Sequence, residues 1–481
     1  MAMRRHVSRS ARVVVTAIGA DADATLRDHI RYDSPWFNQP LHSDLDEDDV
    51  LVDLSASAVH WVDVLMAIGQ YQQQPEPPYT PGMEWSGIVT GVGLRAAEKW
   101  AVGDRVATEI FSDVSAGARS YSKKYHQFGG FATQAIAHAE GLRRIPDGWS
   151  AVQAACFGGA FETAYHALIH VAKLQPGERV CIVGATGACG LAAAQICRAI
   201  GCPIVAAGGS PAKLERVRAI VDNADLPADP VVAATHSYLH AGEEGGGASS
   251  SAETTTRQCV RKWGGKTAVH SSETTTRSNR NVLRDAVRGA GEEWSKGADV
   301  VFDTVGGDVG QQALRASAFG ARICIVGWTS TPFAGGGRGA GADHATGTCA
   351  FISLLLSPTT EYLAVIPADV HANIGHASRY PLQHTHLYIL FSILPKANAI
   401  PTNIVQMKGL HVLGCPVAIH TRFDPSIRVP RMQALAEWVR DGLIVPHVDA
   451  TFPLKDAADA LRAKWGREIV GGCAVICDGS S

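Results

Sequence analysis

The chain lacks the cysteine patterns that hold structural metal ions. It has 11 cysteines among 481 residues, but no two of them form a C-x-x-C pair or a zinc-ribbon spacing. Several, such as Cys181 and Cys324, lie inside apolar runs, where a thiol usually acts as a small buried hydrophobe. The odd count, without a secretory signal, predicts free thiols in a reducing compartment.

Long apolar runs and a strong net charge are lacking as well. The longest apolar runs, F-I-S-L-L-L-S and L-Y-I-L-F-S-I-L, are far shorter than the roughly 20 residues that span a bilayer, so we expect no membrane segment. The formal net charge is -3, which gives no reason to expect nucleic acid as a partner. The N-terminus is rich in arginine, as transit peptides are, but strand-like A-R-V-V-V follows at once. We therefore expect the cytoplasm rather than the mitochondrion.

What the chain does have is the composition of a globular protein with two kinds of domain. Hydrophobic residues make up 46% and charged residues 19%, a balance that supports a buried core. Residues 1–157 contain short β-branched stretches separated by turn signals such as P-P-Y-T-P-G and I-P-D-G. Residues 158–439 alternate apolar strands with helical patterns, which predicts an α/β domain with a parallel sheet. Near the end, residues 431–446 predict a helix followed by an exit turn, and 471–478 predict a final short strand.

Two segments interrupt this rhythm. Residues 240–280 are rich in Gly, Ser and Thr and contain S-A-E-T-T-T-R and S-S-E-T-T-T-R, which predicts a disordered loop with a local duplication. Two copies are too few for a stacked repeat fold. Residues 331–398 form an irregular connection of unusual length. This second segment holds a His-x-His pair, His384 and His386, but no cysteine or carboxylate pattern accompanies it, so we predict no metal site.

The strongest chemical signal is the glycine turn V-G-A-T-G-A-C-G at 183–190. It follows a buried strand, opens a small-residue helix, and precedes a second strand, which together predict one βαβ unit. A dinucleotide needs such a turn, because its pyrophosphate must approach backbone N–H groups at a helix N-terminus. The predicted cofactor-binding residues here are Gly184, Gly187, Ala188, Cys189 and Gly190.

The end of the second strand predicts which dinucleotide binds. An NAD site usually has an acidic residue there for the ribose 2′-OH, whereas this chain reads A-A-G-G-S-P-A-K at 206–213. Ser210 can donate a hydrogen bond to a 2′-phosphate, and Lys213 supplies a positive charge. We therefore predict NADPH as the cofactor.

These residues, in this order, resemble the medium-chain dehydrogenase/reductase superfamily, and within it the zinc-free quinone oxidoreductase and enoyl reductase branch. The motifs that carry the resemblance include W-V-D-V-L-M-A-I-G-Q-Y (61–71), P-Y-T-P-G-M-E-W-S-G-I-V (78–89), V-G-D-R-V (102–106), T-A-Y-H-A-L (163–168) and F-P-L-K-D-A-A-D-A-L (452–461). The resemblance implies a GroES-like β-barrel domain at 1–157, completed by 440–481, and a Rossmann NADP-binding domain at 158–439. In this family G-W-T-S (327–330) and I-P-T-N (400–403) would be joined with almost no residues between them. Residues 331–398 are therefore either a poorly folded insertion or translated intron sequence.

Three departures from the superfamily's patterns matter. Zinc alcohol dehydrogenases need Cys, His and Cys ligands, and the matching positions here hold His60, Met83 and Gly159, which is too few ligands for catalytic zinc. The branch often has Asn where His60 stands, so a role for that side chain is in doubt. The turn has Ala188 where the branch usually has glycine, which is tolerable unless the position needs a positive φ.

The resemblance also implies roles for single residues. Tyr71 matches a tyrosine that enoyl thioester reductases use as proton donor, although a tyrosine packed in the wall of the site is an equal alternative. Thr163 matches a threonine beside the nicotinamide, and Tyr238 and Arg467 match residues near the 2′-phosphate. Gly327 and Trp328 follow a predicted strand, so their backbone should border the nicotinamide half.

The leading hypothesis is an NADPH-dependent reductase that transfers hydride to a small quinone or to an α,β-unsaturated carbonyl, without zinc. The alternatives are an NADPH-binding interaction protein with little turnover and an alcohol or aldehyde dehydrogenase. A homodimer is possible by resemblance, through the edge of the Rossmann sheet.

Overall fold

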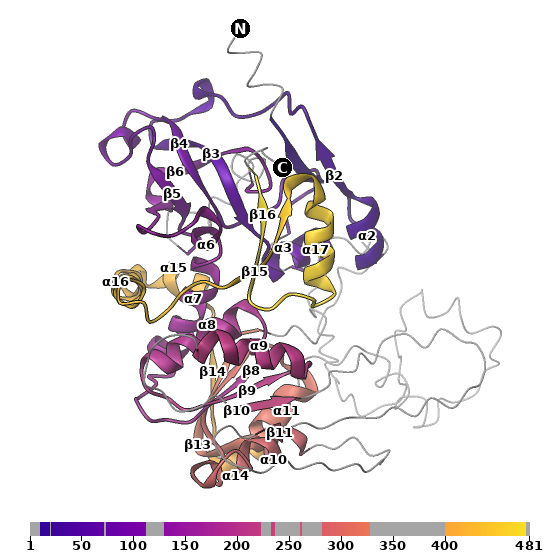
Figure 1. The fold of residues 1–481 in the computed structure, drawn as a ribbon, viewed down its shortest axis with the longest axis vertical. Coiled ribbons are helices and arrows are strands. Elements are labelled where there is room, and N and C mark those ends of the chain that lie inside the picture. Colours follow the sequence, from indigo (N-terminus) through magenta and orange to yellow (C-terminus); the bar gives the residue numbers. More distant parts are fainter. Residues whose placement is uncertain are drawn as a thin grey trace, which may run out of the picture.

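The computed structural model describes residues 10–19, 21–71, 74–111, 129–222, 232–235, 260–261, 281–327 and 400–477. The predictions for Tyr238, for Trp328 and for the segment 331–398 lie outside these residues, as do both copies of the repeat. The described chain forms two folded halves, each built around one seven-stranded sheet (Figure 1).

The first half is a mostly antiparallel sheet in the order β15-β16-β3-β4-β5-β7, with β6 also paired to β3. Its long central strand is β3, which is buried along most of its length. The strands are β3 (Asp49–Ala58), β4 (Trp85–Val92), β5 (Arg105–Thr108), β6 (Gln134–His138), β7 (Leu142–Arg144), β15 (Val448–Pro453) and β16 (Gly472–Ile476). A separate hairpin pairs β1 (Arg12–Val15) with β2 (Ile30–Asp33).

The C-terminal segment returns to this first half. Strand β16 pairs antiparallel with β3, so the yellow end of the chain lies among indigo and purple segments in Figure 1. Helix α17 (Ala457–Trp465) packs against α3 (Trp61–Ala67), where Trp465 and Trp61 stack with ring centroids 5.6 Å apart. The core of this half therefore joins residues from both ends of the chain.

The second half is a sheet in the order β11-β10-β9-β8-β12-β13-β14. All neighbours are parallel except β10 and β11. Its strands are β8 (Val180–Val183), β9 (Ile204–Gly208), β10 (Val232–Thr235), β11 (Val260–Arg261), β12 (Ala298–Asp303), β13 (Ser317–Ile325) and β14 (His411–Gly414). Leaving out the short β11, the order is that of the doubly wound dinucleotide-binding fold.

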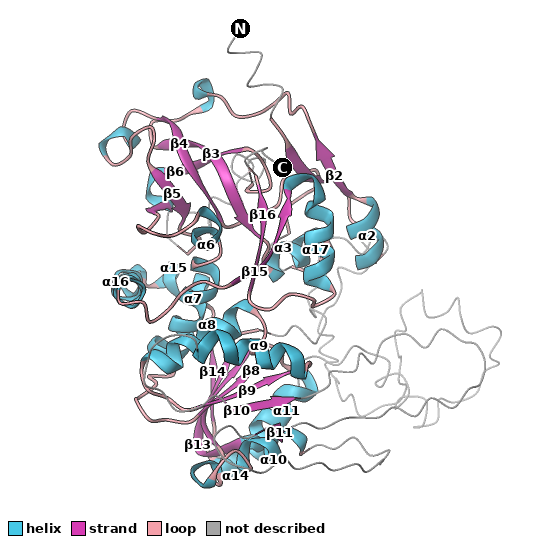
Figure 2. Cartoon of the chain, in the orientation of Figure 1, coloured by secondary structure: helices cyan, strands magenta, loops and turns pink. Residues whose placement is uncertain are grey.

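Helices cover both faces of this sheet (Figure 2). Side chains that alternate along a strand enter different cores: Val180 and Ile182 of β8 pack on one side, and Cys181 and Val183 on the other. Two-sided burial explains why these strands read as continuous apolar runs. The helices are α7 (Gly158–Tyr165), α8 (Ala188–Ala199), α9 (Pro211–Asp222) and α16 (Arg428–Arg440) on the first side, and α10 (Val282–Arg288), α11 (Gly307–Ala316) and α14 (Thr402–Lys408) on the second.

The remaining short elements connect these layers. They are α2 (Ala22–Asp28), α6 (Ala151–Ala155), α15 (Val417–Phe423), the π-helical turn η4 (His166–Val171) and the 3-10 turns η1 (His42–Asp44), η2 (Ala96–Glu98), η3 (Ala139–Gly141), η5 (Glu292–Trp294), η7 (Pro425–Ile427) and η8 (Leu454–Asp456). Among the described residues, no helix is both long enough and apolar enough to cross a membrane.

The helix near the C-terminus begins earlier than the sequence predicts. The sequence predicts a helix followed by an exit turn over 431–446, and α16 runs from Arg428 to Arg440. The turn follows at Gly442, which adopts a left-handed conformation with φ +72° and turns the chain away from the helix axis. Residues after this turn lead into β15 and the first half.

Candidate active site

The glycine turn lies where a dinucleotide-binding fold needs it. It connects the carboxyl end of β8 to the first turn of α8, and Gly187 is the residue that caps this helix. Gly184 has φ +83°, a conformation that residues with a Cβ rarely adopt. Ala188 is the first residue of the helix, so its methyl group meets no backbone strain and the departure from the branch's pattern is tolerated.

Gly187 and Gly190 of this turn are glycines for different physical reasons. A Cβ on Gly190 would lie 2.7 Å from the Cα of Ala185, so Gly190 lets α8 approach the turn closely. A Cβ on Gly187 would meet only the carbonyl oxygen of Gly184, at 3.5 Å, which is an ordinary contact. The protein itself does not require a glycine at 187, whereas a pyrophosphate that approaches the helix N-terminus does. The turn therefore fits a dinucleotide.

The predicted 2′-phosphate residues meet after β9. Ser210 lies two residues after the end of this strand, and its hydroxyl oxygen accepts a hydrogen bond from the backbone N–H of Lys213 at 3.4 Å. The ammonium group of Lys213 contacts the carbonyl oxygen of Arg467, a residue that lies 254 positions later in the chain. Burial lowers the pKa of Lys213, and the nearby Arg216 lowers it further. The structure thus brings Lys213 beside the backbone of Arg467, and the role of both residues toward a 2′-phosphate stays a prediction.

Several strands end beside the glycine turn. The side chain of Thr304, just after β12, donates to the carbonyl oxygen of Val183 at 3.0 Å and abuts Gly184. After β13, the backbone N–H of Gly327 donates to the carbonyl oxygen of Asp303 at 3.2 Å. Ligands of doubly wound sheets bind at the carboxyl ends of the strands, where the strand order reverses between β8 and β12. Gly327 therefore lies on the expected side of the sheet.

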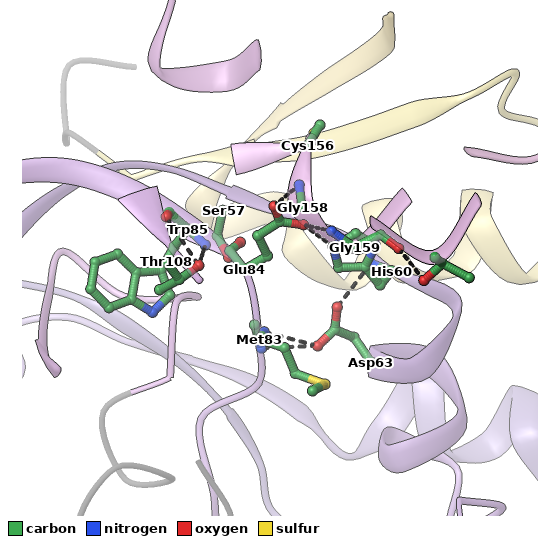
Figure 3. A network of polar contacts seen from close by, with 12 residues as sticks. Ser57, His60, Asp63, Met83, Glu84, Trp85, Thr108, Cys156, Gly158 and Gly159 are labelled. Carbon is green, nitrogen blue, oxygen red and sulfur yellow. Dashed lines mark hydrogen bonds and ion pairs between the residues drawn. The ribbon is translucent and has the colours of Figure 1, made fainter. Parts of the chain in front are cut away.

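The three positions that match zinc ligands meet in the first half, but they hold a different network (Figure 3). The Nε2 atom of His60 lies 2.7 Å from Oε2 of Glu84. The Glu84 carboxylate, which is fully buried, also accepts hydrogen bonds from the backbone N–H groups of Gly158 at 2.5 Å and Gly159 at 3.0 Å. A Cβ on Gly159 would lie 2.8 Å from Cε1 of His60. Glycine at 159 therefore makes room for the histidine ring.

A second carboxylate fixes the loop that carries this network. Asp63 accepts a hydrogen bond from the backbone N–H of His60 at 2.8 Å and from the backbone N–H groups of Gly82 and Met83, each at 3.2 Å (Figure 3). His60 thus begins helix α3 with its backbone N–H held. Each buried polar group here has a partner, which is what a rigid site requires.

Glu84 controls the protonation of His60. Burial alone lowers the pKa of the His60 imidazole, but the hydrogen bond and negative charge of Glu84 outweigh it, so the pKa of His60 is raised. The His60 side chain is 18% exposed while Glu84 is completely covered. The site therefore holds a histidine that keeps its proton to higher pH than usual.

Helices α7 and α8 connect this network to the glycine turn. The hydroxyl of Thr163 donates to the carbonyl oxygen of Gly159 at 2.7 Å. The thiol of Cys189 lies 3.9 Å from the same oxygen, and burial raises its pKa to about 11. Thr163, Cys189 and the His60–Glu84 pair therefore form one continuous group, although they come from distant parts of the chain.

Lys464 belongs to this region and was missed from the sequence. Its ammonium group donates to the carbonyl oxygen of Gly471 at 3.3 Å, and burial lowers its pKa while the nearby thiols of Cys473, Cys156 and Cys189 oppose that shift. The sequence does contain a signal for Lys464, because Ala457, Leu461 and Lys464 recur at helical spacing. This spacing places the lysine on the apolar face of α17.

Tyr71 lies just after α3 and is partly buried against the core of the first half. This position agrees with a tyrosine packed in the wall of the site. Its role as a proton donor stays a prediction.

Comparisons with known proteins agree with this architecture. Residues 46–147 match the alcohol dehydrogenase GroES-like domain. The chain is 25% identical over 426 residues to quinone oxidoreductase-like protein 2 of Rattus norvegicus, covering 88% of this chain and 83% of that protein.

Two solved structures share the fold over nearly the whole chain. The quinone oxidoreductase of Thermus thermophilus, which was solved alone and with NADPH, has a TM-score of 0.58 at 20% identity and covers 97% of this chain and 99% of its own. The CurK enoyl reductase has a TM-score of 0.59 at 16% identity and covers 98% and 99%.

A GroES-like half joined to a doubly wound dinucleotide-binding half defines the medium-chain dehydrogenase/reductase fold, and the predicted fold class is confirmed. Within that superfamily the chain is similar to quinone oxidoreductase-like proteins. Its relatives include quinone oxidoreductases, and its glycine turn fits a nicotinamide dinucleotide.

Proposed function

We propose that this protein is an NADPH-dependent reductase that delivers hydride to a small quinone or to an activated alkene, including enoyl thioesters, without zinc. The observation that carries the proposal is the pairing of His60, which stands at a zinc-ligand position, with Glu84. This pair is joined through Gly159 and Cys189 to the glycine turn. The Thermus quinone oxidoreductase and the CurK enoyl reductase, which share the fold, support this choice of acceptors.

The donor atoms at this place do not suit catalytic zinc. Such a metal takes three protein ligands, usually Cys, His or carboxylate. Here Met83 and Gly159 provide no such ligand, and both oxygens of Glu84 already accept hydrogen bonds from Gly158, Gly159 and His60. Removing those bonds would leave buried N–H groups without partners, which is costly.

The choice of NADPH over NADH follows from the residues after β9. No carboxylate follows this strand to bind a ribose 2′-OH or to repel a phosphate. Ser210, Lys213 and Arg467 come together there instead. A 2′-phosphate would replace the carbonyl oxygen of Arg467 as the partner of the Lys213 ammonium, and a charged partner binds an ammonium more strongly.

The bound nicotinamide supplies a hydride, and the protein must supply the rest. Hydride addition to the β-carbon of an enone moves the alkene electron pair onto the carbonyl oxygen, and one proton is then needed at the α-carbon. His60 is a candidate for this proton, because the hydrogen bond and charge of Glu84 and the charge of Asp63 raise its pKa. Tyr71 is the second candidate. For a quinone acceptor, water can provide the proton.

The proposal is tested by following oxidation of NADPH and NADH by the purified chain with a panel of quinones and a crotonyl thioester. We expect turnover with at least one acceptor, faster with NADPH, and unchanged after treatment with a zinc chelator. Retained NADPH binding with no turnover on any acceptor would favour the interaction-protein alternative. Turnover of alcohols that the chelator abolishes would contradict the zinc-free mechanism.

A further inference from the structure

Three histidines from two elements converge at the far end of helix α7. His166 and His170 lie four residues apart on the π-helical turn η4, and His420 lies on α15. The ring centroids are 5.0 to 5.1 Å apart in all three pairs. One ligand nitrogen from each ring lies within 4.8 Å of the other two.

The spacing of these nitrogens is close to that of a coordination sphere. Nδ1 of His420 lies 3.3 Å from Nε2 of His166. Two imidazole ligands of one tetrahedral zinc ion, each bound at roughly 2.0–2.1 Å, have nitrogens about 3.3 Å apart. The remaining distances close by rotation of His170 and His420, which are only partly buried. His166 is fully buried and gives the cluster a fixed member.

Hydrogen bonding alone leaves this cluster incompletely satisfied. Nδ1 of His166 is buried and has no hydrogen-bond partner in the described structure. Its Nε2, the nitrogen near His420, meets another imidazole rather than a carboxylate or carbonyl oxygen, so it can turn its lone pair toward a metal ion.

The charges around the cluster nearly balance. Arg431 adds a positive charge near the three histidines, but its guanidinium is paired with the buried carboxylate of Glu162 at 2.8 Å. Lys173 adds a positive charge near His170, and Asp424 adds a negative charge near both His170 and His420. A divalent ion therefore meets no large uncompensated positive charge.

We propose that His166, His170 and His420 bind one divalent transition-metal ion, of the class that prefers imidazole, such as Zn²⁺, Co²⁺ or Ni²⁺. Three histidines leave the fourth position of a tetrahedral ion to water. The ion joins η4, which carries His166, to α15, which carries His420, 254 residues later in the chain. It therefore acts as a structural link between the two elements. Gly158, which contacts Glu84 at the start of α7, is about 12 Å along the helix from His166, and Thr163 is about 4.5 Å from it, so the metal ion would lie at the other end of α7 from the His60–Glu84 pair.

The site is tested on the untagged full chain by titration with Co²⁺ alone, followed in the visible spectrum, and with Zn²⁺ by calorimetry. We expect one equivalent to bind, tetrahedral Co²⁺ bands to form, and the melting temperature to rise. His170→Ala and His420→Ala should each weaken binding by more than about tenfold, since even partners of ligands matter by 10–100-fold. His166 is not the residue to change, because removing it would leave a hole in the core.

Two control variants make the test decisive. His411→Ala removes an exposed histidine of β14 and should bind metal like the unchanged chain. The double variant His384→Ala/His386→Ala removes the His-x-His pair and should also bind normally. Absence of Co²⁺ bands, or binding that survives both His170→Ala and His420→Ala, or binding lost only in the double variant, would each overturn the proposal. None of these outcomes depends on the acceptor of the reductase.

Discussion

At the scale of single residues, the choice between the two dinucleotides depends on Lys213. Its ammonium contacts a backbone carbonyl oxygen, that of Arg467, in the absence of any phosphate. The lysine is half-buried and its pKa is lowered by that burial. A residue in this position gains most from a fully charged partner, because a charge-assisted hydrogen bond is stronger than one to a neutral oxygen.

Lys213→Ala should therefore weaken NADPH binding selectively. A hydrogen bond to a charged group contributes about 1.5–3 kcal/mol, which corresponds to roughly a 10- to 150-fold increase in the dissociation constant. NADH, which lacks the 2′-phosphate, should be affected far less. Fluorescence titration with both cofactors measures the difference, and Lys455→Ala, at an exposed lysine of η8, is the control. Equal losses for both cofactors would show that Lys213 does not bind the phosphate.

His60 makes a second prediction at this scale, on stability against pH. Its pKa is raised in the folded protein, so the charged pair with Glu84 stabilises the fold fully below the unfolded value of about 6.5. That contribution is lost as the pH rises through the folded pKa. In His60→Asn, whose amide can still donate to Glu84, this pH dependence should be absent.

Thermal unfolding of both proteins between pH 6 and pH 9 checks this expectation. The stability advantage of the unchanged chain, about 1.5–3 kcal/mol for a charged hydrogen bond, should shrink as the pH rises. A difference that stays constant over this range would mean that folding does not shift the pKa of His60. The same variant, assayed beside Tyr71→Phe, separates the two candidate proton donors: the one that delivers the proton loses turnover with little change in NADPH affinity.

At the scale of elements, helix α8 connects the glycine turn to the core of the second half. Its first turn must approach the end of β8 closely, and its N-terminal N–H groups must stay open to a ligand. These are separate demands. Gly190 meets the first one, since a Cβ there would lie 2.7 Å from backbone, whereas a Cβ on Gly187 has ordinary room.

Gly187→Ala and Gly190→Ala should therefore differ. Gly187→Ala should change the free energy of unfolding by less than about 1 kcal/mol, as at other helix caps, while it weakens NADPH binding. Gly190→Ala should destabilise the fold, because overpacking costs about 1–3 kcal/mol and backbone atoms yield little. That cost exceeds the roughly 1 kcal/mol of helix propensity that alanine offers over glycine. Denaturant unfolding and NADPH titration distinguish the two, and the idea fails if Gly187→Ala binds NADPH normally.

At the scale of the whole molecule, each half is completed by chain segments from far away. Strands β15 and β16 enter the first sheet from the C-terminus. Helix α14 forms the crossover from β13 to β14, as expected if I-P-T-N at 400–403 continues the family pattern directly after 327. Strand β14 is the outer strand of the second sheet, and the predicted homodimer through that edge stays a prediction.

Deletion of residues 251–277, which removes both copies of the repeat and strand β11, should leave NADPH binding unchanged within about twofold. The predicted cofactor residues of the described chain lie outside this segment, and a change in loop length costs little, about 0.6 kcal/mol for each doubling. NADPH titration of the deletion variant measures the effect. Loss of binding would show that the loop contributes to the adenosine end of the site.

The sequence alone predicted much of this protein because the signals are local. The glycine turn, the missing acid before Ser210, and the alternation of strands and helices each depend on neighbours within one βαβ unit. The type of helical turn was not predicted: after α7, which ends at Tyr165, the chain continues in the π-helical turn η4, and hydrophobic spacing does not distinguish an α turn from a π turn.

Only the tertiary structure decided how distant groups pair. It placed Glu84 between His60 and the start of α7, brought Lys464 beside three thiols, and joined His166 to His420. Such contacts join positions that are far apart in the chain, so no local pattern encodes them. Burial then set their chemistry, because the pKa of a histidine depends on the groups that the fold brings next to it.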